Sequence, residues 1–193
     1  MINSKEDLRR YLEEDKKNNS VKNVHPVAKI IIKIIFNLDI DPIWTFIVVL
    51  RKLEYYTNCP SIGNRLFKSY YRCKFRKLSM RLGFSIPINV LGPGVSIPHY
   101  GTIVINPNSK IGKNCRIHVG TNIGMHKGMA PIIGDNVYIG PGAILFGDII
   151  IADNVSIAAN STVSKSVLEK NTVIAGTPAK IIKEQSQPWN YGK

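Results

Sequence analysis

Aliphatic residues recur every six positions through the second half of the chain, with one gap of ten residues. The members of this ladder are Ile105, Ile111, Ile117, Ile123, Ile133, Ile139, Leu145, Ile151, Ile157 and Val163. Four positions after nearly every member stands a second small or branched residue, and these are Ser109, Cys115, Thr121, Val137, Ala143, Ile149, Val155, Ser161 and Val167. An amphipathic helix repeats its apolar positions about every 3.6 residues and a half-buried strand about every two, so neither explains this period. A short fixed period predicts a solenoid in which each repeat stacks on its neighbours.

The period is typical of a parallel β-helix whose coil contains three short strands, one per hexapeptide. Residues about eighteen apart then lie one above the other, with the aliphatic side chains inside and the coils about 4.8 Å apart. Small residues such as Gly112 and Gly134 often follow the aliphatic step, where they let the chain turn at a corner. A β-sandwich with chance spacing is the alternative, which the number of matching steps disfavours.

The first 85 residues lack the ladder and are predicted to be helical. Ser4 followed by Asp7 resembles a capping box that opens a helix reaching about Asn18. Apolar runs at 27–36 and 43–50 predict two more helical segments ahead of a basic one. Neither run has the roughly 18 to 20 uncharged residues that cross a bilayer, so we expect them to pack on each other or on neighbouring subunits.

These patterns divide the chain into three parts. Residues 1–85 are expected to form an α-helical region that Gly83 closes, because glycine is favoured just after a helix. Residues 86–183 are expected to form the β-helix, and residues 184–193 a C-terminal tail. The predicted protein is therefore mainly β, with a helical N-terminal region.

Positive charge is concentrated in the helical region of a chain whose formal net charge is +13. Between Arg51 and Leu82, nine basic residues are opposed by Glu54 alone. Such a run is most often a solvated helix face. The functional alternative is an anionic partner: a lipid surface, an acidic polysaccharide intermediate or the phosphates of a small ligand. No nucleic-acid recognition motif accompanies the charge, so nucleic acid is not an expected partner.

The cysteines and the N-terminal sequence indicate the cellular compartment in which the protein is expected. The three cysteines, Cys59, Cys73 and Cys115, form an odd set without a CxxC pair, so neither a disulfide framework nor a zinc knuckle is expected. The N-terminus has no signal-peptide cleavage pattern. We therefore expect a cytoplasmic protein, with peripheral association of the basic helices with the inner face of the membrane as a further hypothesis.

Two segments carry a family resemblance. Residues 97–112, IPHYGTIVINPNSKIG, and residues 138–182, which end in AGTPAKII, resemble the hexapeptide-repeat acyltransferases and in particular their serine O-acetyltransferase branch. The resemblance covers residues 84–183. It implies a left-handed β-helix, a homotrimer, and acetyl-CoA as the acetyl donor.

His99 is the first candidate for a catalytic residue. Extending the ladder backwards from Ile105 puts His99, Pro93 and Pro87 on step positions, so the spacing alone suggests a buried histidine among the inward aliphatic residues. The resemblance instead implies that His99 is the catalytic base, which removes the proton from the acceptor hydroxyl. Imidazole, with an unperturbed pKa near 6.5, is suited to that proton transfer. Backbone N–H groups near Gly124 or Gly128 are candidate donors to the oxyanion.

Three further side chains are candidates for the same site. His118 follows Tyr100 by eighteen residues, so we expect it one coil above Tyr100 and close to the edge that carries His99. It is either a second catalytic histidine or an exposed surface residue. His126 lies in the irregular segment GMHKGMAP, where an excursion from a solenoid can display binding groups, and we assign His126 and Tyr100 to acceptor binding. A plain exposed histidine is the alternative for His126.

The chain departs from the serine acetyltransferase pattern at three acceptor positions. Pro98 stands where the family has the aspartate before its catalytic histidine, Phe84 where it has a second aspartate, and Ala130 where it has an acceptor-site histidine. These losses suggest the same donor with a different acceptor. We prefer a sugar hydroxyl of an exopolysaccharide or cell-wall precursor, with L-serine kept open.

The donor site follows from the same resemblance. The pantetheine arm would run along the groove between adjacent subunits, and the adenine and 3′-phosphate would lie near AGTPAK. The implied contacts are Gly124, Met125, Pro141, Ala159, Thr177 and Lys180, with Lys165 adding charge. A simple turn that ends the solenoid is the alternative for AGTPAK, and the two interpretations are compatible.

Two other functions fit a trimeric β-helix. The γ-class carbonic anhydrases use three histidines, two of them five apart, whereas His99, His118 and His126 are separated by nineteen and eight, so we expect no metal. A noncatalytic scaffold that uses its flat faces for assembly is the remaining alternative.

Overall fold

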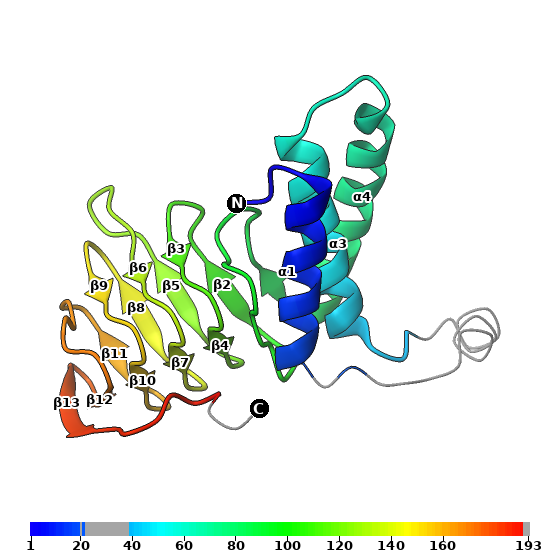
Figure 1. Ribbon diagram of the computed structural model, residues 1–193. Coiled ribbons are helices and arrows are strands. Elements are labelled where there is room, and N and C mark those ends of the chain that lie inside the picture. The colour runs from blue at the N-terminus through cyan, green and yellow to red at the C-terminus, as the bar shows by residue number, and fades with distance from the viewer. Residues whose placement is uncertain (20, 22–38, 191–193) are drawn as a thin grey trace.

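The protein combines a layer of helices with a β-helix, which lie side by side in Figure 1. The computed structural model describes residues 1–19, 21 and 39–190. The helices are α1 (Lys5–Asn18), α3 (Pro42–Asn58) and α4 (Asn64–Leu82). The apolar run at 27–36 lies outside the described residues. No helix within the described part of the chain is long and apolar enough to cross a membrane.

The helix ends follow the local sequence signals. The Ser4 hydroxyl accepts a hydrogen bond from the Asp7 N–H at 2.9 Å, so the predicted cap of α1 is confirmed. The Asp41 carboxylate caps α3 in the same way, accepting from the Trp44 N–H at 3.2 Å. Gly83 ends α4 with a φ of 78°, in the left-handed region that glycine adopts without cost.

Short parallel strands form three flat faces, and the chain visits them in turn. The strands are β1 (Phe84–Ser85), β2 (Ile103–Ile105), β3 (Lys110–Ile111), β4 (Arg116–Ile117), β5 (Asn122–Gly124), β6 (Ile132–Ile133), β7 (Tyr138–Ile139), β8 (Ile144–Phe146), β9 (Ile150–Ile151), β10 (Ser156–Ile157), β11 (Thr162–Val163), β12 (Thr172–Gly176) and β13 (Ala179–Glu184). The first face stacks β1-β2-β5-β8-β11, the second β3-β6-β9, and the third β4-β7-β10-β12, with β13 added antiparallel to β12. The predicted left-handed β-helix is confirmed.

The ladder forms the core of the β-helix. All ten of its members are at most 5% exposed, and Ile117, Ile123, Ile139, Leu145 and Ile157 are fully buried. The second set of small or branched residues is buried with them, except Val167, which is half-buried. The inward direction predicted for the aliphatic ladder is therefore confirmed, and the second set contributes to the same core.

An asparagine ladder fixes one corner of the coils. Its four members, Asn114, Asn136, Asn154 and Asn171, all have φ between 54° and 59°. Each side-chain amide donates to the next oxygen along the stack, at 3.2, 3.0 and 2.8 Å. Asparagine tolerates the left-handed region better than other residues with a side chain, which explains its recurrence at this turn.

The first coil has a different register from the one predicted. Leu91 pairs with Ile111 and Ser96 with Arg116, an offset of twenty residues. The buried step positions are therefore Leu91 and Ile97. The prediction that His99, Pro93 and Pro87 occupy inward slots is wrong, because two extra residues between Ile97 and Ile105 shift the register.

A buried ion cluster joins the helices to this first coil. The Arg51 side chain is 0% exposed and pairs with Asp15 at 2.8 Å and Glu54 at 3.1 Å. It also donates hydrogen bonds to the carbonyl oxygens of Leu91 and Gly92, at 2.9 and 2.6 Å. Arg51 was counted in the basic run of the helical region, but its charge is already neutralised inside the protein.

Candidate active site

One corner of the β-helix, between the third and first faces, carries His118 and is called the histidine edge below. Its coils are aligned by backbone hydrogen bonds from His118 N–H to Ile139 O at 3.1 Å and from Gly140 N–H to Ile157 O at 2.9 Å. The residues that follow at the same corner are Pro141 and Ala159, whose backbones are joined through Asn160 N–H to Pro141 O at 2.9 Å. The edge is therefore a continuous row along the coils.

His99 lies at the start of this edge and is exposed. Its ring centroid is 6.2 Å from that of His118. Because of the twenty-residue offset, Pro98 rather than Tyr100 is level with His118, which corrects the predicted stacking. The expected proximity of His118 to the edge that carries His99 is nevertheless found. His99 is outside the core, where a second molecule can reach it.

Gly101 shapes the loop that presents His99. Its φ is 132°, and a Cβ at this position would lie 2.4 Å from Cγ2 of Val119. Its N–H donates to Leu82 O at 2.8 Å, at the end of α4. A glycine is required here because any side chain would meet both backbone strain and the neighbouring coil.

The half-buried His118 imidazole is held by its neighbours. Nε–H of Arg116 donates to Nε2 of His118 at 3.2 Å, and the Tyr138 ring centroid is 5.0 Å from the imidazole centroid. Burial lowers the pKa of His118, and the positive charge of Arg116 and the proximity of His99 lower it further. His118 is thus favoured in its neutral form, with the Nε2 lone pair already engaged and the proton on Nδ1.

Arg116 connects this edge to the C-terminal tail. Its Nη1 donates to Ser96 Oγ at 3.3 Å, and its guanidinium lies 5.4 Å from the Trp189 ring centroid. The Trp189 Nε1–H donates in turn to Asn114 O at 2.9 Å. The tail therefore runs back along the third face to the early coils (Figure 1), a contact that the sequence alone does not indicate.

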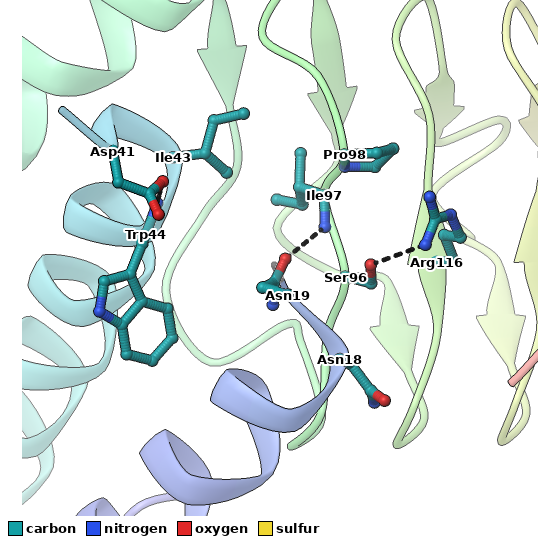
Figure 2. Close-up of a pocket in the computed structure, with 9 residues that line it drawn as sticks. All are labelled: Asn18, Asn19, Asp41, Ile43, Trp44, Ser96, Ile97, Pro98 and Arg116. Carbon is teal, nitrogen blue, oxygen red and sulfur yellow. Dashed lines mark hydrogen bonds between the residues drawn. The ribbon is translucent and has the colours of Figure 1, made fainter. Parts of the chain in front are cut away.

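A cavity of about 210 Å³ lies beside the edge, between the helices and the first coils. Its lining residues are Asn18, Asn19, Asp41, Ile43, Trp44, Ser96, Ile97, Pro98 and Arg116. Figure 2 shows Asp41 and Trp44 on the helical wall, opposite Pro98 and Arg116 on the β-helix wall. Asn19 bridges the walls by accepting from the Ile97 N–H at 3.2 Å. The cavity thus adjoins His99 through Pro98 and His118 through Arg116, and it contains one acidic and one basic side chain.

The three positions that depart from the family pattern offer no charge to this cavity. Phe84 is 3% exposed and packs edge-to-face on Phe46, with ring centroids 5.0 Å apart. Pro98 is part of the cavity wall. Ala130 belongs to the irregular loop after β5. Asp41 and Arg116, which sequence reasoning missed, are the charged side chains at the cavity, and neither lies in a motif that marks it.

His126 lies at a different corner of the same chain. The irregular segment forms a small hairpin in which His126 and Met129 exchange backbone hydrogen bonds at 2.9 and 3.1 Å. Lys127 and Gly128 form its tip, with φ values of 51° and 82°. This hairpin follows the first face, whereas His118 precedes it, so His126 does not join the histidine pair within one chain. No group of metal-ligating side chains is found among the residues that the structure describes.

The predicted donor contacts fall in two rows, one on each side of the first face. Pro141, Ala159 and Thr177 are exposed along the histidine edge, where Thr177 Oγ1 lies 3.3 Å from Thr162 Oγ1. Gly124 and Met125 lie at the opposite side, where Asn108 Nδ2 contacts Met125 Sδ at 3.8 Å. The basic candidates Lys165 and Lys180 are exposed near the last coil. Lys165 follows the first face, as Met125 does, whereas Lys180 lies on the side of the histidine edge.

Comparison with known proteins agrees with this architecture. Residues 130–165 match the family described as Bacterial transferase hexapeptide (six repeats). Serine acetyltransferase from Staphylococcus epidermidis is 34% identical over 135 residues, which are 65% of this chain and 63% of that protein. The chain therefore spans less than two thirds of the length of this curated relative.

Solved structures show the same fold. The crystal structure of serine acetyltransferase from Brucella abortus superposes with a TM-score of 0.65 at 24% identity, covering 93% of this chain and 68% of that one. The same enzyme in complex with coenzyme A gives a TM-score of 0.62 at 22% identity, with coverages of 93% and 67%. At these identities the similarity establishes the fold. Residues 130–165 therefore match the hexapeptide-repeat family, and the chain as a whole is similar to serine acetyltransferases in part of its sequence and in its fold.

Proposed function

We propose that the protein transfers an acetyl group from acetyl-CoA to a hydroxyl of a small acceptor, with His99 as the general base. The observation that carries this proposal is the exposed His99 imidazole, whose ring centroid is 6.2 Å from that of His118 and which adjoins the open cavity between the helices and the coils. A base that takes part in proton transfer must be within reach of its substrate, and the outward position of His99 meets that condition.

The chemistry needs one proton acceptor and a positioned thioester. His99 removes the hydroxyl proton while the oxygen attacks the thioester carbonyl carbon. The C–S bond then breaks, and the thiolate of coenzyme A leaves with the proton that His99 returns. His118 has its Nε2 engaged by Arg116 at 3.2 Å, so it is better suited to orient groups through Nδ1–H than to accept that proton.

The donor is supported by the row of small residues on the histidine edge and by the coenzyme A complex of the Brucella abortus relative. In our proposal, acetyl-CoA lies in a groove between two subunits of a homotrimer. Because Gly124 and Met125 are at the other side of the first face from Pro141 and Ala159, a groove made by two chains brings both rows to one ligand. Thr177 and Lys180 would contact its nucleotide end. Acetyl-CoA is made in the cytoplasm, where unpaired Cys59, Cys73 and Cys115 are also stable, so we place the reaction there.

We prefer a sugar hydroxyl as the acceptor, for example in an exopolysaccharide or cell-wall precursor. The position that would hold an amino-acid ammonium group carries Phe84, and the position of the carboxylate that would orient His99 carries Pro98, so neither supplies a charge. L-serine is the second candidate, because Asp41 and Arg116 give the cavity the opposite charges that a zwitterion requires.

The test is release of free CoA thiol from acetyl-CoA in the presence of L-serine, other amino acids, or nucleotide- and lipid-linked sugars. His99→Ala should lower turnover by about 10² to 10⁴-fold, the usual contribution of a general base, without weakening acetyl-CoA binding measured by calorimetry. Lys110→Ala, exposed on β3 of the second face and away from both rows, is the control. Full activity of His99→Ala together with an inactive His118→Ala would transfer the role of base to His118. Absence of turnover with every acceptor would favour the noncatalytic scaffold.

Asp41→Asn separates the two acceptors. If L-serine occupies the cavity, the variant should lose L-serine turnover, because an amide does not compensate the ammonium charge. If a neutral sugar is the acceptor, the same variant should retain most of its turnover. Light scattering of the purified protein tests the trimer in the same samples.

A further inference from the structure

The outer surface of α4 exposes a line of large apolar side chains. Ile62, in the turn before the helix, is 92% exposed, and Leu66, Tyr70 and Met80 are 81%, 57% and 83% exposed. Leu66, Tyr70 and Met80 share one side of α4 with Cys73 and Lys77, since the steps alternate between four and three residues. Exposed apolar side chains are common singly, but a row of them along one helix marks an interaction surface.

The opposite side of α4 is used for packing, so the exposed row cannot turn inward. Leu78 and Leu82 are buried, and Phe75 stacks on Phe46 of α3 with ring centroids 5.4 Å apart. Near the turn, Tyr56 of α3 stacks on Phe67 at 5.3 Å. α4 is therefore a rigid element at the outside of the helical layer (Figure 1), with its exposed side held in one orientation.

Basic side chains flank the apolar row without acidic counterparts in the helix. α4 contains seven of them, Arg65, Lys68, Arg72, Lys74, Arg76, Lys77 and Arg81, and no Asp or Glu. The ion pairs found among the described residues involve other basic residues, Arg10, Arg51, Lys113 and Lys170. The charge of α4 is thus available to an anionic surface, unlike that of the buried Arg51.

We propose that α4 and the turn before it dock on an anionic lipid bilayer, with Ile62, Leu66 and Tyr70 entering the interface. Binding of an amphipathic helix parallel to a membrane combines apolar burial with attraction of Lys and Arg to anionic headgroups, and α4 offers both on one exposed surface. Symmetric pairing of α4 with a second copy would instead bring two helices with seven positive charges each against one another. The lipid surface is therefore the better partner on charge.

The experiment is co-sedimentation of the full chain with vesicles of phosphatidylcholine alone or with about one third phosphatidylglycerol. We expect binding to the anionic vesicles, weakened by salt, and little binding to the neutral ones. Arg72→Gln/Arg76→Gln should lower partitioning about fivefold for each charge removed. Ile62→Ser/Leu66→Ser should lower it as well, because the apolar contribution is lost.

Matched controls carry the same changes away from α4. Lys110→Gln/Lys183→Gln removes two exposed charges of the β-helix, and Leu168→Ser replaces a side chain that is 69% exposed there. Both should bind anionic vesicles like the unmodified chain, with circular dichroism verifying the fold of every variant. Equal binding to neutral and anionic vesicles, or equal loss in the controls, would overturn the proposal. The proposal would also be overturned if the Ile62→Ser/Leu66→Ser variant formed a smaller oligomer but bound vesicles as before. The apolar row would then be a contact between copies of the chain.

Discussion

Arg116 donates the hydrogen of its Nε to Nε2 of His118, at a distance of 3.2 Å. The same guanidinium lines the cavity and lies 5.4 Å from the Trp189 ring. One side chain therefore donates to an imidazole at the histidine edge, forms part of the cavity wall and contacts the tail. The predictions that concern this edge follow from that arrangement.

Replacement of Arg116 by Met should raise the pKa of His118. The pKa is below the ordinary 6.5 because of burial first and then the charge of Arg116 and the neighbouring His99, so the variant loses the second of these causes. NMR titration of the His118 ring protons measures the midpoint in both proteins. Arg81→Met, on the exposed end of α4, should leave the midpoint where it is, and an equally unmoved midpoint in Arg116→Met would contradict the assigned cause.

The same shift predicts a loss of stability in acid. His118 has a lower pKa in the folded protein than in the unfolded chain, so the unfolded chain binds its proton first as the pH falls. The contribution of His118 to folding is fully present above about pH 6.5 and is lost as the pH falls toward its folded pKa. Urea denaturation at several pH values should therefore show a smaller decrease over this range in His118→Gln, which cannot titrate. Parallel pH profiles for the two proteins would argue against the shift.

Arg51→Met should lower the free energy of unfolding far more than the replacement of an exposed arginine does. It would leave the carboxylates of Asp15 and Glu54 without their cation in a buried place, which typically costs about 3 to 5 kcal/mol. The matched change is Arg10→Met, because the Arg10–Asp7 pair at 2.9 Å lies at the surface, where solvent screens the attraction and its loss should cost little stability. Denaturant midpoints and slopes give both free energies of unfolding. Similar values for the two variants would mean that the cluster does not join the helices to the first coil.

Asn154 permits a separation of backbone and side-chain effects within the asparagine ladder. Its φ is 59°, and its side chain bonds Asn136 at 3.0 Å and Asn171 at 2.8 Å. Asn154→Gly removes only the hydrogen bonds, worth about 0.5 to 1.5 kcal/mol each, whereas Asn154→Ala adds the left-handed strain of about 1 to 2 kcal/mol. Thermal and urea unfolding should rank the alanine variant below the glycine variant. The reverse order would show that the turn does not require this conformation.

The regular coils were predictable because their signal is local and repeated. A six-residue period in Ile133, Ile139 and Leu145 has one explanation in terms of burial, and each added step strengthens it. The first coil was mispredicted because the period was extended across an insertion. Leu91 and Ile97 are apolar and six positions apart, so the sequence also contains the correct register, which is shifted by two residues. The extended period instead selected Pro93 and His99.

The cavity and its charges depend on contacts that a linear pattern does not contain. Asp41 precedes Pro42 as an ordinary helix cap, and nothing in its sequence surroundings relates it to Arg116, which is 75 positions away. The contact between Trp189, near the end of the described chain, and the Arg116 guanidinium likewise depends on the tertiary fold. Arg51 illustrates the converse, since a basic residue in a basic run is buried between Glu54, three positions along the same helix, and Asp15, which the tertiary fold brings from α1.

Gly101→Ala should damage the presentation of His99 more than the stability of the whole protein. An alanine Cβ at φ 132° would meet Val119 Cγ2 at 2.4 Å, so the loop must move away from the next coil and take His99 with it. Acetyl transfer should therefore fall by about tenfold or more, because small displacements of a catalytic group are costly. Gly63→Ala is the matched change, since Gly63 has a φ of −66° and a Cβ there meets nothing within 4 Å. Val119→Ala added to Gly101→Ala should restore part of the activity by removing the clash. If the single Gly101→Ala variant retains full activity, the position of His99 does not depend on this close approach.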